Sequence, residues 1–253
     1  MAPRWAWQAA NRETMKPLMI VMGHKAAEPT LAMNGDMFLR QGCDVIGFSP
    51  QDGTVFPWPA SLAYGRSEHS GPAMIARMHW LLRTAARLSD RIIITEADQL
   101  FFGRPLGERK WNWAGLTAPV KQNHDAAFAA SWYVVIPWIM DAKTAILIAD
   151  ELQAMAKING HTGWCIEKGY NDRALGLAVH RLRARKALAF HEIKDHWTDE
   201  TDLAEKAKPN IWNELALDLY SGKITMVHSI KTAEQYGKLM TPVRAFQTSG
   251  VPA

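Results

Sequence analysis

The sequence has few cysteines and no long apolar run. Its two cysteines, Cys43 and Cys165, are too few for a disulfide framework or a cysteine-rich zinc site. The longest apolar run, residues 133–140, contains a proline and is much shorter than the roughly 20 residues of a membrane span. Residues 1–15 lack the continuous apolar region of a secretory signal. We therefore expect a soluble, cytoplasmic protein without a membrane span.

Several motifs of common enzyme classes are also missing. No G-x-G-x-x-G follows the first predicted strand and no G-x-x-x-x-G-K-[ST] occurs, which argues against a dinucleotide oxidoreductase and a P-loop enzyme. Residues 191–196, HEIKDH, have one residue too many for the zinc-protease motif. Residues 65–69, GRSEH, lack the final glycine of a nucleophile elbow, and no strand precedes them.

The remaining composition is that of a packed globular protein. The chain has 253 residues, of which 48% are hydrophobic and 21% charged, and this suits one sizeable domain. Lys and Arg number 29 against 25 Asp and Glu, so the net charge is +4. That charge permits an anionic partner without requiring one.

Short apolar segments alternate with helical patterns along the chain. Strands are predicted at residues 17–22, 43–48, 91–95, 113–117, 131–136 and 224–227, and helices at residues 29–41, 72–88, 141–156 and 172–187. Residues 49–72 are expected to form a loop. The alternation predicts an α/β fold with a mostly parallel central sheet flanked by helices. Ligands of such sheets bind at the carboxyl ends of the strands.

Two carboxylates follow the most apolar of these strands. The segment RIIIT at residues 91–95 leads directly into Glu96 and Asp98. Two neighbouring acids at a strand end repel each other unless a cation or hydrogen-bond donors compensate them. A hard divalent cation takes oxygen ligands of this kind. The alternative is a strand end capped by two solvated acids.

Residues 65–101 resemble the nucleotide-sugar-binding half of GT-A glycosyltransferases. A glycine, Gly71, begins a helix that carries Arg77, and a buried strand ends in an acid-x-Asp motif. The usual motif is Asp-x-Asp, so Glu96 departs from it. The resemblance implies a GT-A-like single domain. Its expected parts are an N-terminal extension (1–16), a nucleotide-sugar-binding half (17–101), an acceptor-binding half (102–240) and a flexible tail (241–253).

The resemblance also implies roles for residues near the metal and the donor. It predicts a divalent metal, Mn²⁺ or Mg²⁺, held by Asp98 and His228, with His191 and His196 as competing ligands. His228 can equally be a surface histidine after a strand. The residues expected to contact the nucleotide diphosphate sugar are His24, Lys25, Arg77, Glu96 and Lys231. For His24 and Lys25 the alternative is an ordinary connection between a strand and a helix.

The expected catalytic residue is Asp172. Residues 169–173, GYNDR, resemble the x-Glu-Asp motif of the family, with Asn171 in place of the usual Glu. In an inverting enzyme this aspartate takes the proton of the acceptor hydroxyl, and in a retaining one it positions the acceptor. The alternative is an N-terminal helix cap, for which Asn and Asp are both suited.

The acceptor is less well defined by the sequence than the donor. The chain is similar to phage glycosyltransferases that modify hydroxymethylated pyrimidines in DNA, so the favoured partner is double-stranded DNA with modified bases and the location a host cytoplasm. The basic segment 181–186, RLRARK, can contact phosphates or form a solvated helix face. A hexosyl- or pentosyltransferase acting on a carbohydrate, and a noncatalytic nucleic-acid-binding module, are the alternatives. Seven tryptophans fall in the expected acceptor half, at positions 111, 113, 132, 138, 164, 197 and 212.

Overall fold

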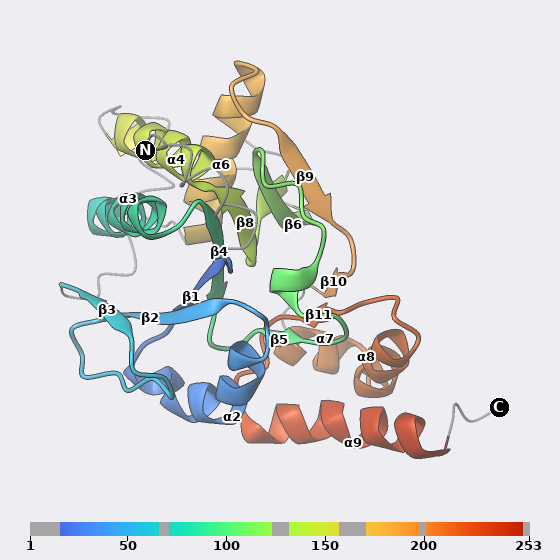
Figure 1. The fold of residues 1–253 in the computed structure, drawn as a ribbon. Coiled ribbons are helices and arrows are strands. Elements are labelled where there is room, and N and C mark those ends of the chain that lie inside the picture. Colours follow the sequence, from blue (N-terminus) through green and yellow to red (C-terminus); the bar gives the residue numbers. More distant parts are fainter. Residues whose placement is uncertain (1–15, 66–70, 123–131, 157–170, 198–200, 250–253) are drawn as a thin grey trace, which may run out of the picture.

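The protein is built around one large mixed sheet (Figure 1). The computed structural model describes residues 16–65, 71–122, 132–156, 171–197 and 201–249. Within them, eight strands pair in the order β3-β2-β1-β4-β8-β6-β7, with β9 also on β6. Their bounds are β1 Leu18–Met22, β2 Asp44–Pro50, β3 Ser61–Tyr64, β4 Arg91–Glu96, β6 Leu116–Gln122, β7 Trp132–Val134, β8 Trp138–Asp141 and β9 Phe190–Ile193.

Most strands of this sheet run in the same direction. β1, β2, β3 and β4 pair in parallel, β8 is antiparallel to β4, and β6 is antiparallel to β8 and so shares the direction of β4. β9 runs parallel to β6, and β7 runs antiparallel to it. The predicted α/β fold with a mostly parallel central sheet is therefore confirmed. Ile92, Ile93 and Ile94 of β4 have no exposed surface, as expected of a strand covered on both faces.

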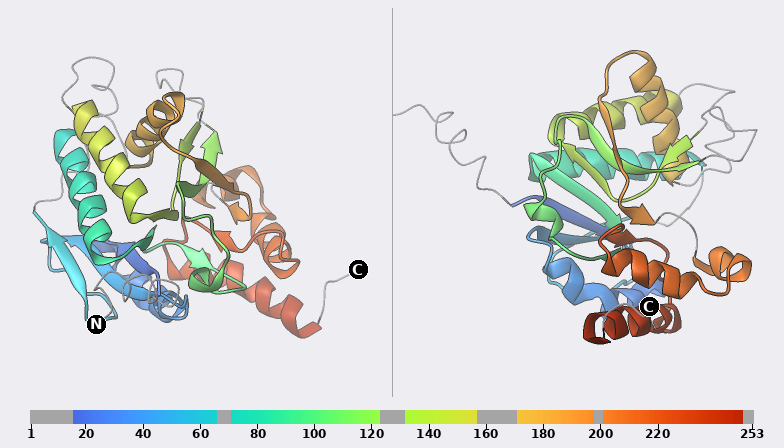
Figure 2. Two further views of the ribbon diagram at one scale, coloured as in Figure 1. Left: turned by 45° about the horizontal axis from the view of Figure 1, so that its top comes forward. Right: turned by 90° about the vertical axis from the view of Figure 1, so that its right-hand side faces the viewer.

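Helices cover both faces of the sheet (Figures 1 and 2). On one face lie α3 (Gly71–Leu88), α4 (Ala142–Ala156) and α6 (Asn171–Ala184). They share an apolar core with the strands that includes Ile75, Leu82, Ile148, Ile94 and Trp138. On the other face lies α2 (Glu28–Leu39), whose Leu31 and Phe38 pack against Met19, Val21 and Ile93. The alternation of side chains along each strand divides the core between the two faces.

A smaller sheet and the C-terminal helices complete the fold. Three short strands pair in the order β10-β11-β5, with bounds β5 Leu100–Phe101, β10 His196–Trp197 and β11 Met226–Val227. The helices are α7 (Thr201–Ala207), α8 (Ile211–Tyr220) and α9 (Ala233–Ser249), and the two 3-10 turns are η1 (Lys25–Ala27) and η2 (Leu106–Glu108). A third apolar cluster joins β11, α8 and α9.

The predicted element boundaries are wrong in three places. The expected loop 49–72 contains β3, which lengthens the parallel part of the sheet. The strand expected at residues 113–117 begins only at Leu116, because Gly115 has a left-handed φ of 100° that interrupts an extended chain. Residues 241–249, expected to be a loosely held tail, belong to α9, and Val243 is buried against α8.

Substitution of Gly115 tests this boundary. A Cβ atom there would lie 2.4 Å from the carbonyl oxygen of Ala189, in addition to the unfavourable φ. We expect Gly115→Ala to lower the free energy of unfolding by about 1–3 kcal/mol in urea denaturation. Gly65→Ala is the control, since a Cβ at Gly65 meets no atom of the described residues within 4 Å. Equal stability of the two variants would contradict the close approach at Gly115.

Candidate functional site

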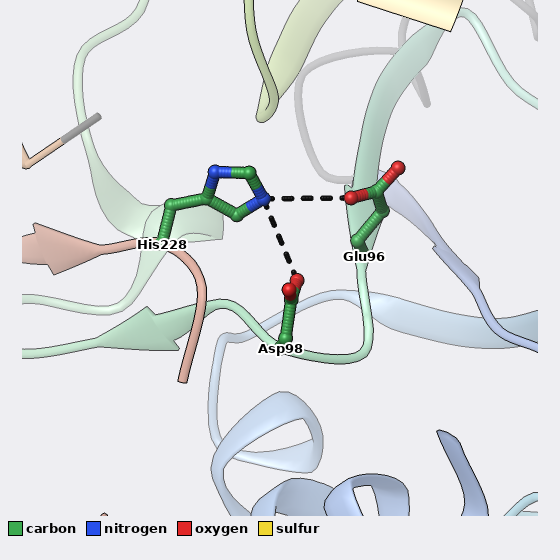
Figure 3. A group of neighbouring side chains, drawn as sticks. All are labelled: Glu96, Asp98 and His228. Atoms are coloured by element: carbon green, nitrogen blue, oxygen red, sulfur yellow. Dashed lines mark hydrogen bonds and ion pairs between the residues drawn. The ribbon is translucent and has the colours of Figure 1, made fainter. Parts of the chain in front are cut away.

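Three side chains from two distant segments of the sequence meet at the carboxyl edge of the sheet (Figure 3). Glu96 ends β4, Asp98 follows it by two residues, and His228 comes directly after β11. The Nε2 atom of His228 lies 3.4 Å from Oε2 of Glu96 and 3.5 Å from Oδ1 of Asp98. One potential ligand atom from each residue lies within 4.8 Å of the other two. These three residues are called the triad below.

Backbone hydrogen bonds hold the acidic turn of the triad in place. The amide of Ala97 donates to the carbonyl of Met22 at the end of β1, over 3.0 Å. The carbonyl of Ala97 accepts from Nδ2 of Asn34, a buried residue of α2, also over 3.0 Å. Met22 and Glu96 are paired in the parallel register of β1 and β4. The two acids therefore project from the end of the sheet where α/β folds bind ligands.

His228 is held from two sides. Its amide donates to the carbonyl of Trp197 over 3.2 Å, and the amide of Ile230 donates to the carbonyl of Asp98 over 3.0 Å. Between them, Ser229 is buried and has a left-handed φ of 65°. A non-glycine residue in this conformation is strained, and such residues concentrate at functional sites. The strained turn directs the imidazole of His228 toward the two acids.

The triad forms a partly buried charge cluster. The side chains of His228 and Asp98 are 17% and 16% exposed, and that of Glu96 is 37% exposed. Burial favours neutral His228, but the charges and hydrogen bonding of Asp98 and Glu96 outweigh it and raise the pKa of His228 to about 10. Burial also opposes ionisation of Asp98, but the charges of His228 and Lys231 hold the pKa of this carboxyl below its usual value. Without a metal, His228 therefore carries a proton at neutral pH and faces Asp98 and Glu96.

The donor atoms of the triad suit a divalent cation. Two carboxylates and one imidazole nitrogen match the preferences of Mn²⁺, and carboxylates also bind Mg²⁺. Oδ1 of Asp98 is buried and makes no short hydrogen bond among the described residues, since its contact with the imidazole of His228 is 3.5 Å long. A buried carboxylate oxygen with so weak a contact is costly, and a bound cation would satisfy it.

Arg77 and Lys231 lie near the same edge of the sheet. Arg77, on α3, donates from Nη1 to the hydroxyl of Tyr64 over 3.1 Å, and its guanidinium lies 5.2 Å from the centre of that ring. Tyr64 ends β3 and is thus at the carboxyl edge. Lys231 is exposed, three residues after His228, and its charge acts on Asp98. Both cations are therefore placed on the ligand side of the sheet.

The two residues that follow β1 differ in their contacts. His24 is exposed just before η1. Nζ of Lys25 donates to Oε1 of Glu28 over 2.9 Å, and its backbone amide donates to Oδ2 of Asp52 over 2.8 Å. The ammonium of Lys25 thus already has an anionic partner, and any contact with a donor substrate must compete with Glu28.

The other predicted site residues do not join the triad in the described part of the chain. His196 is buried, with Nε2 at 2.7 Å from Nε2 of Gln99, and burial followed by the charge of His228 holds its pKa well below the usual value. His191 lies on β9, away from the candidate ligand group. Asp172 is the second residue of α6, but its side chain lies outside the described residues, as do Gly169 and Tyr170.

The basic segment 181–186 is largely engaged within the chain. Arg181 and Arg185 both donate to the buried carboxylate of Glu151 on α4. The guanidinium of Arg183 lies 5.5 Å from the centre of the Phe190 ring. Three of its cations thus tie α6 to neighbouring elements, which weakens the case for a phosphate-binding surface here.

The tryptophans of the expected acceptor half mostly contribute to apolar packing. Trp138 and Trp212 are buried, Trp111 and Trp113 pack against the core beside α2, and Trp197 packs against the C-terminal cluster. Trp164 and the side chain of Trp132 lie outside the described residues. The five described side chains are therefore primarily structural.

Comparison with solved structures identifies the fold. The sequence itself matches no protein-family profile and no curated protein. The glycosyltransferase GlyE of Streptococcus pneumoniae TIGR4 aligns with 92% of this chain at 10% identity and a TM-score of 0.50. The chain has the GT-A fold. It spans 64% of the length of GlyE. The galactosyltransferase LgtC, solved with donor and acceptor sugar analogues, aligns with 93% of this chain and 97% of its own length at 10% identity and a TM-score of 0.48.

The triad has a defined place relative to the two sheets. The triad sits where the parallel strands β1 and β4 end, beside the small sheet whose strand β11 leads into His228.

None of the helices in the described ranges combines the length and apolar character that a membrane span requires. Two residues next to the triad, Asn34 and Gln99, were not predicted from sequence, because no local pattern distinguishes a buried amide from a surface one.

Proposed function

We propose that the chain is a metal-dependent glycosyltransferase that moves a sugar from a nucleotide diphosphate sugar to a hydroxyl acceptor. The observation that carries the proposal is the convergence of Glu96, Asp98 and His228 at the carboxyl edge of a GT-A fold. Three potential ligands from two separate segments meet there around a buried carboxylate oxygen that makes no short hydrogen bond to any described residue. A strand end with merely solvated acids does not require this arrangement.

The residues of the site divide into a metal-binding and a diphosphate-binding set. In the proposed reaction Asp98 and His228 hold Mn²⁺ or Mg²⁺, and Glu96 completes the set or contacts the donor. When bound, the ion stabilises the negative charge that develops on the leaving diphosphate. Arg77 and Lys231 add charge-assisted hydrogen bonds to the same phosphates.

Other residues act on the remaining parts of the substrates. Asp172 takes the proton of the acceptor hydroxyl if the reaction inverts the anomeric centre, and positions the acceptor if the reaction retains it. His24 and Lys25 follow β1 and contact the base and ribose of the donor. For Lys25 this contact replaces or shares the ion pair with Glu28.

For the acceptor, a hydroxymethylated pyrimidine in DNA remains our first hypothesis and a carbohydrate the second. The net charge of +4 permits DNA as a partner without requiring it. The engagement of Arg181 and Arg185 with Glu151 removes part of the basic surface expected for it. Transfer of radiolabelled sugar to hydroxymethylated duplex DNA, but not to an oligosaccharide, would support the first hypothesis, and the reverse result would reject it.

The donor is identified by a thermal-shift screen of nucleotide sugars with and without Mn²⁺. A ligand that binds only the folded chain raises its unfolding temperature, by an amount that grows with ligand concentration. We expect at least one nucleotide sugar to raise this temperature when Mn²⁺ is present and to raise it less when EDTA is added. If no donor binds and none is hydrolysed, the enzyme proposal is wrong and a noncatalytic role is favoured.

A further inference from the structure

A buried hydrogen bond between Gln99 and His196 lies beside the triad. The two Nε2 atoms are 2.7 Å apart, Gln99 has no exposed surface and His196 is buried. The rings of His196 and His228 lie 6.4 Å apart between centres, with their planes inclined by 34°. Gln99 is the neighbour of Asp98 in sequence. This polar pair therefore adjoins two of the three proposed metal ligands.

The hydrogen bond between Gln99 and His196 joins the segments on either side of β11, the strand that ends directly before His228. In the small sheet β11 lies between β10 and β5, and Met226 pairs with His196 on one side and with Phe101 on the other. Gln99 immediately precedes β5, and His196 begins β10. The side-chain bond thus links the turn of Asp98 to the strand whose Trp197 carbonyl accepts the amide of His228. The backbone of His228 is thus held between the turn that carries Asp98 and β10.

Packing alone does not explain why the side chains at positions 99 and 196 are polar. The amide nitrogen of Gln99 carries only donor hydrogens, so Nε2 of His196 accepts and the ring is neutral. Oε1 of Gln99 and Nδ1 of His196 have no hydrogen-bond partner among the described residues. Two apolar side chains of the same shape would pack at least as favourably as an incompletely satisfied polar pair. A role in holding two segments at a fixed separation, through a directional hydrogen bond, explains these two residues better than packing does.

We propose that Gln99 and His196 are positioning residues that set the separation of Asp98 and His228 and thereby the affinity of the triad for a divalent cation. The inference rests on the proposed function, because it requires the triad to bind metal. Two other links between the segments, from Ile230 to Asp98 and from His228 to Trp197, are backbone hydrogen bonds. The bond between Gln99 and His196 is a side-chain link that substitution can remove.

The test is the affinity of the full chain for Mn²⁺, measured by titration calorimetry in the absence of any donor. Gln99→Leu, His196→Phe and the double variant are compared with the wild type. Asp98→Asn is the control for loss of a ligand. His191→Phe is the matched control, since His191 also has a ring nitrogen that makes no hydrogen bond to a described residue but lies on β9.

We expect each single variant and the double variant to bind Mn²⁺ about tenfold more weakly than the wild type, as for other residues that orient metal ligands. His191→Phe should bind it normally. The double variant should recover most of the unfolding temperature that each single variant loses, since it leaves neither polar partner alone. It should not recover the affinity for Mn²⁺. This separation of stability from affinity is what a purely structural pair would not show.

Three results would overturn the inference. The first is wild-type affinity in a folded single variant. The second is that the double variant recovers both its affinity for Mn²⁺ and its stability. This second result overturns the inference even if a single variant does not fold. In both cases the proposed metal site would still be supported if the wild type binds Mn²⁺ and Asp98→Asn does not. Absence of Mn²⁺ binding by the wild type would overturn the inference and the proposed function together.

Discussion

Asp98→Asn is expected to lower the turnover of donor, with or without an acceptor, by about a thousandfold, which is the scale of losing one electrostatic contact to the transition state. The substitution keeps the size of the side chain but removes one of two carboxylates from the triad. Asp98 is the more buried of the two acids, and its Oδ1 atom makes no short hydrogen bond within the part of the chain that the structure describes. Turnover is measured as release of the nucleoside diphosphate at saturating Mn²⁺.

The matched control for this prediction is Asp44→Asn. Asp44 is an exposed aspartate at the start of β2, at the opposite end of the parallel strands from the triad. It should turn over donor at the wild-type rate. Circular dichroism must show that both variants are folded. A folded Asp98→Asn variant that retains full activity would remove the metal role from the triad.

The affinity for Mn²⁺ is expected to rise steeply with pH. Asp98 and Glu96 raise the pKa of His228 to about 10, so the metal-free protein carries a proton on the nitrogen that must bind the ion. Binding therefore releases one proton, and affinity should increase about tenfold per pH unit, or about 300-fold between about pH 6 and pH 8.5. Calorimetry in buffers of different ionisation enthalpy measures the released proton directly.

The proton on His228 also affects the stability of the metal-free protein, but in the opposite direction: stability falls as the pH rises, whereas the affinity for Mn²⁺ increases. The pKa of His228 is raised by folding, so the stabilisation by its ion pairs is complete below pH 6.5, the ordinary pKa of histidine, and is lost as the pH rises toward 10. His228→Asn should abolish both the proton release and this loss of stability. Mn²⁺ affinity that is independent of pH in the wild type would show that His228 is not a ligand.

The large sheet could be predicted because its signals are local. A run of three isoleucines predicts a strand buried on both faces, and β4 is such a strand. The direct succession of Glu96 and Asp98 after it predicts their place at the carboxyl edge. Gly42, which was predicted to end the helix before it, has a φ of 67° but lies beyond the end of α2, whose last residue is Leu39 and whose C-cap is Arg40.

Of the small sheet, β11 was predicted as part of the strand expected at residues 224–227, whereas β5 and β10 were not, because each is only two residues long. β5, β10 and β11 carry no periodicity, and they exist through pairing between residues that are far apart in the sequence. The meeting of His228 with the acids depends on this pairing. A resemblance placed His228 there, whereas the residues alone left it equal to His191 and His196.

The C-terminal helix α9 begins at a sequence signal for a helix N-terminus. The amide of Gln235 donates to Oγ1 of Thr232, and Oε1 of Gln235 accepts from the amide of Thr232, each over 3.1 Å. This is a capping box, and the sequence TAEQ is its typical pattern. Two prolines near the end suggested a loose tail instead, although Pro242 lies inside the helix.

The central claim, that the triad holds a divalent ion, is tested most directly by pulsed electron paramagnetic resonance of Mn²⁺ bound to the full chain. The geometry predicts coupling to one histidine nitrogen, because Nε2 of His228 is the imidazole nitrogen placed at both carboxylates in the described part of the chain. This coupling should be absent in His228→Gln and unchanged in His191→Phe. A nitrogen coupling that persists without His228, or no Mn²⁺ binding by the wild type, would contradict the account.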